Sequence, residues 1–147
     1  MKNNKKTVNR SWIQLILGAL FLAMSVGQIL NFAAFVEILA TYQFFTSDAL
    51  SFFAAIIILT ELYAGLGLVF TKLPFPYRKA AGVFGVLVAL FWTILGAQAF
   101  VRGLDISNCG CFGAYLAQPL RWWILVEDIF FVAGAIRALQ QIKILKQ

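Results

Sequence analysis

The stretch AAGVFGVLVALFWTILGAQAFV, residues 80–101, contains no Asp, Glu, Lys or Arg and decides the fold class. A helix rises about 1.5 Å per residue, so this run is long enough to cross a hydrocarbon layer of about 30 Å. Three further apolar runs, residues 11–30, 49–70 and 120–139, have comparable lengths. The sequence therefore predicts an all-α membrane protein in which four transmembrane helices form an antiparallel bundle.

The composition of the whole chain agrees with this class and excludes others. Of the 147 residues, 62% are hydrophobic and 12% are charged, which is about half the charged share of a soluble domain. The aromatic content of 16% excludes a disordered chain, which lacks the apolar side chains needed for a core. Four spans with short connections use nearly the whole chain, so residues 1–147 should form one integral membrane domain.

The basic residues predict the orientation in the membrane. Ten of the 12 Lys and Arg lie before the first run, between the second and third runs, or near the end of the chain. By the positive-inside rule, both termini are expected in the cytoplasm of a bacterial inner membrane protein. The net charge of +6 is therefore attributed to basic residues that flank the spans of a lipid-embedded protein. It is not interpreted as a surface that binds nucleic acid.

A cleaved signal peptide is the alternative interpretation of the N-terminus. The basic start and the Ala23-Met24-Ser25 triplet loosely resemble a signal sequence with its processing site. The apolar run continues to Leu30, however, and is longer than the usual signal core of about 7 to 15 residues. A first transmembrane span is therefore the preferred expectation.

A short amphipathic helix is expected between the first and second spans, on the outer side. Asn31 is a suitable N-cap, and Phe32, Phe35, Val36 and Leu39 follow at the spacing i, i+3, i+4 and i+7. This spacing places the four apolar side chains in one stripe. Such a helix would lie along the outer membrane face or cover the bundle.

The segment NCGCFG, residues 108–113, falls in the outer connection between the third and fourth spans. Cys109 and Cys111 are expected on the periplasmic side, where two thiols so close together tend to form a disulfide. A bridge over the single residue Gly110 is strained and closes almost no loop, which favours electron exchange over a structural role. An inert bridge, or two small apolar side chains in a glycine turn, is the alternative.

A metal centre and a haem are not expected. The chain contains no His, the usual ligand of bis-imidazole haem and of many metal sites. Asp105 and Asn108, the nearest candidates beside the two thiols, make a poor ligand set for zinc or copper.

Polar residues inside the apolar runs are costly and therefore candidates for function. Gln28, Glu61, Gln98, Glu127 and Asp128 could form a polar pocket beneath the outer connection and receive the protons released when thiols are oxidised. The alternative is a set of helix-to-helix hydrogen bonds that holds the bundle together.

Aromatic residues in the spans could line a quinone cleft, or they could face lipid and pack the core, as in most membrane bundles. The candidates are Phe52, Phe53, Phe91, Trp92, Phe130 and Phe131.

The combined pattern resembles the MauE type within the MauE/DoxX family of redox-associated membrane proteins. The resemblance extends over nearly the whole chain, and the Cys-Gly-Cys-Phe-Gly stretch is its specific part. It rests on LGALF at 17–21, Phe35, Tyr42, Glu61, CGCFG at 109–113, Trp122, Trp123 and Asp128. Many DoxX-type relatives carry a basic residue late in the first span where this chain has Gln28 and Asn31. A charge-dependent ligand site at that position is therefore not expected.

The resemblance implies a four-helix membrane protein associated with disulfide chemistry. MauE proteins of methylamine-oxidising bacteria serve the production of the disulfide-rich small subunit of methylamine dehydrogenase, alongside a thioredoxin-like partner. By analogy alone, the plan is also similar to the quinone-linked disulfide-forming membrane proteins, which use more cysteines than this chain has.

The leading functional hypothesis is a thiol-disulfide redox protein. Cys109 and Cys111 would exchange electrons with a periplasmic thioredoxin-like protein and pass them to or from a quinone. The alternative is a non-catalytic membrane scaffold or assembly factor in which the Cys pair is only a local brace. A transporter or channel subunit, based on Glu61, Glu127 and Asp128, is the weakest of the three, because no inverted repeat is visible.

Overall fold

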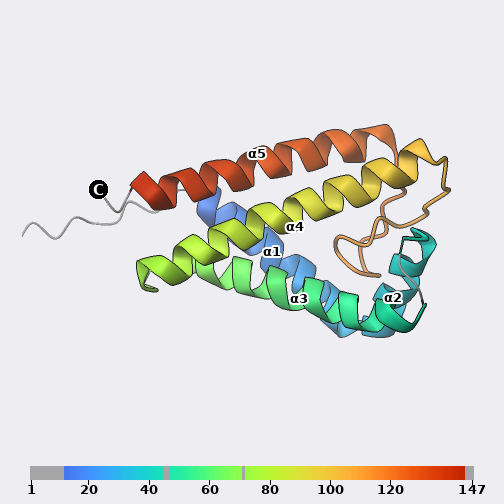
Figure 1. Ribbon diagram of the computed structural model, residues 1–147, viewed down its shortest axis with the longest axis horizontal. Helices are drawn as coiled ribbons and strands as arrows, with labels where there is room; N and C mark the ends of the chain where they lie inside the picture. Colours follow the sequence, from blue (N-terminus) through green and yellow to red (C-terminus); the bar gives the residue numbers. More distant parts are fainter. Residues whose placement is uncertain (1–11, 45–46, 71, 145–147) are drawn as a thin grey trace, which may run out of the picture.

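The computed structural model describes residues 12–44, 47–70 and 72–144. In this part of the chain the elements are α1 (Trp12–Leu30), α2 (Phe32–Thr41), α3 (Ser47–Val69), α4 (Phe75–Val101) and α5 (Trp122–Ile144). No β-strand occurs among these residues, so the predicted all-α class is confirmed (Figure 1). The basic residues that precede Trp12, and Lys146 near the C-terminus, lie outside the described residues.

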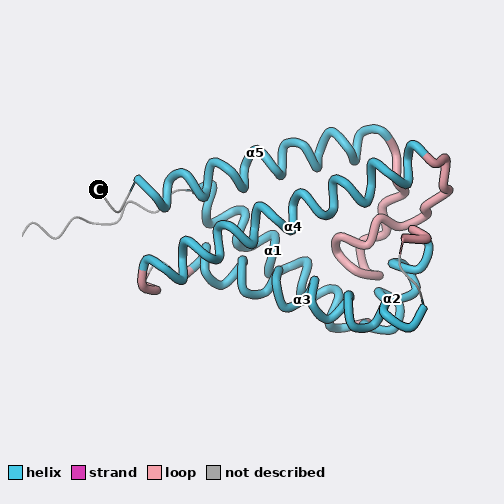
Figure 2. The backbone as a smooth tube through the Cα atoms, in the orientation of Figure 1, coloured by secondary structure: helices cyan, strands magenta, loops and turns pink. Residues whose placement is uncertain are grey.

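The four long helices lie side by side, and α2 sits at one end of them (Figure 1). Helix α1 packs mainly against α3, while α4 packs against both α3 and α5. The contact between α1 and α5 is much smaller. The connection 102–121, here called the cysteine loop, folds back toward the helices at the end where α2 lies (Figure 2).

Three helices are long and apolar enough to cross a membrane. They are α1 over Trp12–Leu30, α3 over Ala49–Val69 and α4 over Phe75–Val101. These helices match the predicted runs 11–30, 49–70 and 80–101, although α4 begins earlier, directly after Pro74. Pro76 falls in the first turn of α4, where a missing backbone N–H breaks no helical hydrogen bond.

The fourth predicted run, residues 120–139, forms most of α5, which begins at Trp122 and continues to Ile144. This helix has 23 residues, as many as α3, but it also carries Glu127, Asp128, Arg137 and Lys143. Because of these charges it is not among the three helices that length and apolar composition alone identify as spans.

The short helix expected after the first span is α2. Its N-cap is Asn31, whose Oδ1 accepts a hydrogen bond of 3.3 Å from the backbone N–H of Ala34. Phe35 and Leu39 of the predicted stripe are fully buried, whereas Phe32 is 38% exposed. The helix therefore presents two of its apolar side chains to the core, where it packs against α3 and α1.

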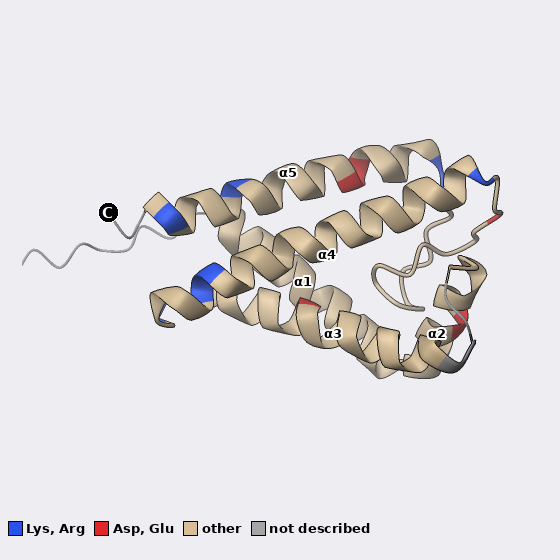
Figure 3. Ribbon diagram, in the orientation of Figure 1, with Lys and Arg blue, Asp and Glu red and all other residues tan. Residues whose placement is uncertain are grey.

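A polar cluster ties three helices together at the end away from the cysteine loop. The Gln14 amide donates to the carbonyl of Ala138 over 3.3 Å and accepts a hydrogen bond of 3.2 Å from the guanidinium of Arg78. The sequence suggests that Arg78 flanks a span, but the structure buries it to 7% exposure. Lys and Arg of α4 and α5 gather toward this same end (Figure 3).

Candidate functional site

The cysteine loop is held in shape by its own backbone. The N–H of Cys109 donates to the carbonyl of Gln118 over 2.8 Å, and the N–H of Leu120 donates to Ile106 over the same distance. These bonds pair the two arms of the loop and leave residues 110–117 as its tip. The cysteines therefore sit where the paired arms open into the tip.

Glycines set the conformation of the tip. Gly110 and Gly113 have φ angles of +82° and +66°, which side chains of L-residues rarely adopt. The Asn108 side chain accepts from the N–H of Gly110 over 3.0 Å and donates to the carbonyl of Gly113 over 3.1 Å. A Cβ on Gly113 would lie 2.6 Å from the carbonyl oxygen of Gly27, so the tip rests directly on the backbone of α1.

Two side chains from other elements hold the carbonyl groups of the cysteines. The hydroxyl of Tyr42, at the C-terminal end of α2, donates to the carbonyl of Cys109 over 2.8 Å. The Nε2 of Gln28, on α1, donates to the carbonyl of Cys111 over 3.0 Å. Burial raises the pKa of the Tyr42 hydroxyl, so this group stays protonated and remains a donor. The positions of both cysteines thus depend on residues far away in the sequence.

The two sulfur atoms lie 3.5 Å apart, within hydrogen-bonding distance, and both cysteines are free thiols. Their hydrogen bond lowers the pKa of Cys109, against the opposing effect of burial. The same hydrogen bond, together with burial, raises the pKa of Cys111. Cys109 is therefore the thiol that ionises first, while Cys111 keeps its proton and stabilises the thiolate.

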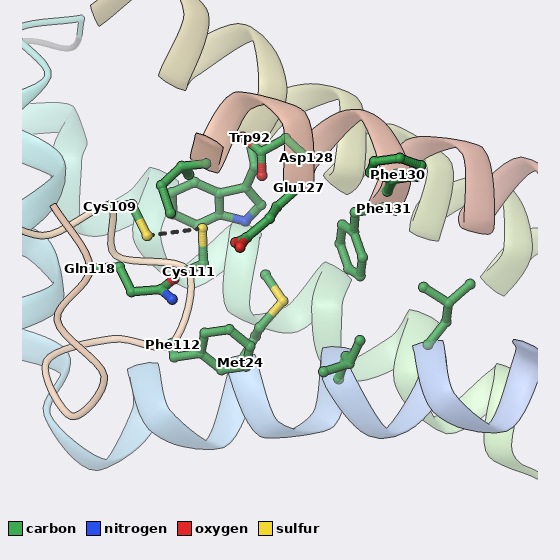
Figure 4. A pocket seen from close by; sticks show the side chains of 13 residues that line it. Met24, Trp92, Cys109, Cys111, Phe112, Gln118, Glu127, Asp128, Phe130 and Phe131 are labelled. Carbon is green, nitrogen blue, oxygen red and sulfur yellow. Dashed lines mark hydrogen bonds between the residues drawn. The ribbon is translucent and has the colours of Figure 1, made fainter. Parts of the chain in front are cut away.

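A cavity of about 400 Å³ adjoins the thiol pair (Figure 4). It lies where α1 and α5 contact each other little, with the cysteine loop at one end. Side chains of Cys109, Cys111 and Glu127 reach into this space (Figure 4). The lining residues are Leu17, Leu20, Met24, Trp92, Cys109, Cys111, Phe112, Gln118, Ile124, Glu127, Asp128, Phe130 and Phe131.

The predicted polar residues occupy three places and not one pocket. Glu127 and Asp128 line the cavity, and the charge of Asp128 raises the pKa of both thiols. Gln98 lies apart from the cavity lining, where it contacts the carbonyl of Tyr42 over 3.4 Å and accepts a hydrogen bond of 3.0 Å from Arg102.

The third place is a buried group around Glu61. The Oε1 of Glu61 accepts a hydrogen bond of 2.8 Å from the indole N–H of Trp92. Gln28 is the other polar side chain beside this carboxyl group. Because Gln28 also holds the carbonyl of Cys111, the buried group and the thiol pair share one residue.

The aromatic residues that were candidates for lining a quinone cleft also lie in different places. Trp92, Phe130 and Phe131 line the cavity. Phe91 packs with its edge on Trp92, and Phe52 and Phe53 lie next to each other on α3.

Sequence reasoning did not assign a role to Tyr42, Asn108 or Gln118 in the shape of the site. No local signal could have identified Tyr42, because its partner in the cysteine loop follows 67 residues later. Asn108 was recognisable in principle, since an Asn before a glycine-containing turn commonly bonds to the turn backbone.

Comparison with known proteins identifies the family of the chain. The family model described as methylamine utilisation protein MauE matches residues 7–140. The methylamine utilization protein MauE of Paracoccus denitrificans is 25% identical over 124 residues, which are 84% of this chain. The chain covers 64% of the length of that relative, and no solved structure shows significant similarity. The chain belongs to the MauE family and is a multi-pass membrane protein.

Proposed function

We propose that the chain is a membrane thiol-disulfide redox protein in which Cys109 and Cys111 alternate between dithiol and disulfide. The observation that carries this proposal is the geometry of the pair. Two free thiols lie 3.5 Å apart beside a cavity, in a loop whose carbonyl groups are held by Tyr42 and Gln28. A purely structural disulfide would add little stability to a loop whose conformation these hydrogen bonds already fix.

Exchange with a partner dithiol would proceed in two displacements. A thiolate of the partner attacks one sulfur of the Cys109–Cys111 disulfide, which forms a mixed disulfide and releases the other cysteine as a thiolate. The second thiol of the partner then attacks the mixed disulfide. Two electrons and two protons have then moved to Cys109 and Cys111, and the partner holds the disulfide. The reverse sequence begins with Cys109, which ionises more readily than Cys111.

The proposed orientation places the thiol pair on the periplasmic side, with four spans and both termini in the cytoplasm. Lys and Arg of α4 and α5 gather toward the end of the bundle opposite the cysteine loop (Figure 3), which the positive-inside rule assigns to the cytoplasm. The exposure of α5 supports a fourth span, because Ile129 and Ile136 are 60% and 41% exposed, as lipid-facing side chains would be.

A quinone is the proposed electron acceptor or donor in the membrane. The cavity has the size of a small-molecule site and a largely apolar lining, so its residues fit a quinone head group. Trp92 and Phe131 would contact the ring, and the carboxyl group of Glu127 also lines the cavity. A bound quinone would take up, or as quinol release, the two electrons and two protons of the dithiol.

A thioredoxin-like periplasmic protein is the proposed partner. The relative from Paracoccus denitrificans is named for methylamine utilization, and the chain covers 64% of its length. From the proposed thiol exchange we infer a role in forming disulfides of exported proteins, and the name of this relative makes the proteins of methylamine metabolism one example.

The reduction potential of the thiol pair tests this proposal. Membranes containing the protein are equilibrated in defined thiol/disulfide buffers and labelled with a mass-tagged alkylating reagent. We expect a reversible bridge with a potential well above about −300 mV, the level below which structural disulfides usually lie. The Cys109→Ser and Cys111→Ser variants should lose the bridge and the exchange with the partner while the helices remain folded.

Two results would overturn the proposal. One is a pair that stays in the thiol form throughout, or a bridge that no physiological thiol reduces. The other is a double Ser variant that still supports maturation of the partner. Either result would favour the scaffold function.

A further inference from the structure

Glu61 is completely buried in the described structure, with 0% exposure, and no basic side chain compensates its charge. Transfer of an unpaired carboxylate to such an environment is very costly, so buried charges are normally paired. Glu61 is instead surrounded by neutral donors and acceptors. The group on α4 is the indole of Trp92, and the group on α1 is the amide of Gln28.

Two oxygen atoms in this cluster have no hydrogen-bond partner. They are Oε2 of Glu61 and Oε1 of Gln28. The other atoms are committed, because Oε1 of Glu61 accepts from Trp92 and Nε2 of Gln28 donates to the carbonyl of Cys111. Both unpartnered oxygens are acceptors, and they belong to neighbouring side chains. One proton on the carboxyl group would satisfy both of them.

We propose that Glu61 is a neutral carboxylic acid whose hydroxyl donates to Oε1 of Gln28, and that it acts as a positioning residue for Cys111. The bond would fix the orientation of the Gln28 amide, so that Nε2 keeps facing the carbonyl of Cys111. The positioning role rests on the proposed redox function of the pair, whereas the protonation state of Glu61 does not.

A Glu61→Gln variant tests whether the side chain of residue 61 acts as a neutral group or as a charged one. The Gln side chain has nearly the same shape, can accept from Trp92 through its oxygen, and can donate to Gln28 through its nitrogen. It therefore reproduces the hydrogen bonds of the protonated acid. A Glu61→Leu variant keeps similar volume but loses both hydrogen bonds.

The protonation state is measured by infrared difference spectroscopy of the wild-type protein against Glu61→Gln at neutral pH. We expect the carbonyl stretch of a protonated carboxylic acid to be present in the wild type and lost in the variant. A difference spectrum that shows only the bands of a carboxylate would overturn the inference. This readout does not depend on any activity of the thiol pair.

The positioning role is measured through the equilibrium between dithiol and disulfide. Gln28 holds the carbonyl of Cys111, so loss of this hydrogen bond should shift the equilibrium between dithiol and disulfide by about fivefold, the effect of one typical hydrogen bond. We expect this shift in Glu61→Leu and in Gln28→Met, and no larger shift in the double variant, because both act on one contact. Glu61→Gln should retain the wild-type equilibrium.

The outcomes distinguish this inference from the proposed function. If the pair cycles reversibly but neither Glu61→Leu nor Gln28→Met changes its equilibrium, the positioning role is wrong and the redox function stands. If the pair never forms a reversible bridge, the redox function and the positioning role fail together, while the infrared measurement still decides the state of Glu61. If Glu61→Leu fails to fold, Gln28→Met carries the test alone.

Discussion

The hydroxyl of Tyr42 donates a hydrogen bond of 2.8 Å to the carbonyl oxygen of Cys109, which follows 67 residues later in the chain. Tyr42 ends α2 and is 1% exposed, so this bond joins the short helix to the cysteine loop in the interior. The backbone of the first cysteine is therefore positioned by a residue that is not part of the Cys-Gly-Cys segment.

A Tyr42→Phe variant should be less stable by about 1 to 3 kcal/mol, because it leaves the buried carbonyl of Cys109 without a partner. Unfolding in mixed detergent micelles measures this loss. Tyr63→Phe is the matched control, because the Tyr63 hydroxyl donates to the carbonyl of Tyr77 over 3.2 Å at an exposed position. Its loss should therefore reduce stability less. Burial raises the pKa of Tyr42 in the folded state, so its contribution is full below the unfolded pKa of about 10 and declines above it. Equal effects of the two substitutions would contradict this prediction.

Removing one thiol should shift the pKa of the remaining thiol, and the direction should depend on which thiol is removed. In Cys111→Ala, the pKa of Cys109 should rise, because the hydrogen bond that lowers it is lost. In Cys109→Ala, the pKa of Cys111 should fall, because the hydrogen bond and the charge that raise it are both removed. The pH dependence of alkylation by iodoacetamide measures each value. Shifts of the same sign in the two variants would show that the thiols do not interact as described.

Asp128→Asn should lower the pKa of both thiols. The negative charge of Asp128 opposes ionisation of Cys109 and of Cys111, so its removal stabilises both thiolates. Alkylation at a fixed pH below the thiol pKa should therefore become faster. Glu127→Gln is the control, because Glu127 also lines the cavity but does not contribute to either shift. If alkylation became faster in Glu127→Gln and not in Asp128→Asn, the charge that acts on the thiols would be that of Glu127.

Two glycines of the cysteine loop should differ in their tolerance of a side chain. Both Gly103 and Gly113 have a φ angle of +66°, so an Ala at either position costs about 1 to 2 kcal/mol of backbone strain. At Gly103 nothing lies within 4 Å of the added Cβ, whereas at Gly113 the Cβ would meet the carbonyl oxygen of Gly27 at 2.6 Å. Gly113→Ala should therefore reduce thermal stability more than Gly103→Ala. Similar losses would show that the loop tip does not rest on α1.

Filling the cavity should slow oxidation of the dithiol by a quinone without affecting exchange with small thiols. Leu20→Phe enlarges a half-buried side chain that lines the cavity, while Ala19→Phe adds the same ring at an exposed position of α1. The rate of disulfide formation after addition of a short-chain ubiquinone distinguishes them. If both variants react at the wild-type rate, the cavity is not the route to the thiol pair.

The apolar runs alone predicted the positions of α1, α3 and α4, because the length and hydrophobicity of a helix are properties of consecutive residues. The helical stripe after Asn31 likewise identified α2. The pair Cys109 and Cys111 stood out because its spacing is local. The end of α5 was less well predicted, because charged residues in its second half interrupt the apolar signal.

Tertiary structure decided which polar residues meet. Gln28 contacts both Glu61 and the backbone of Cys111, whereas Gln98 pairs with Arg102 and lies apart from the cavity lining. Hydropathy and periodicity describe which face of a helix is polar, but they do not state which neighbour that face will contact. That choice depends on how the helices pack. The amide of Gln28 and the carbonyl of Cys111 are separated by 83 residues and become partners only in the folded bundle.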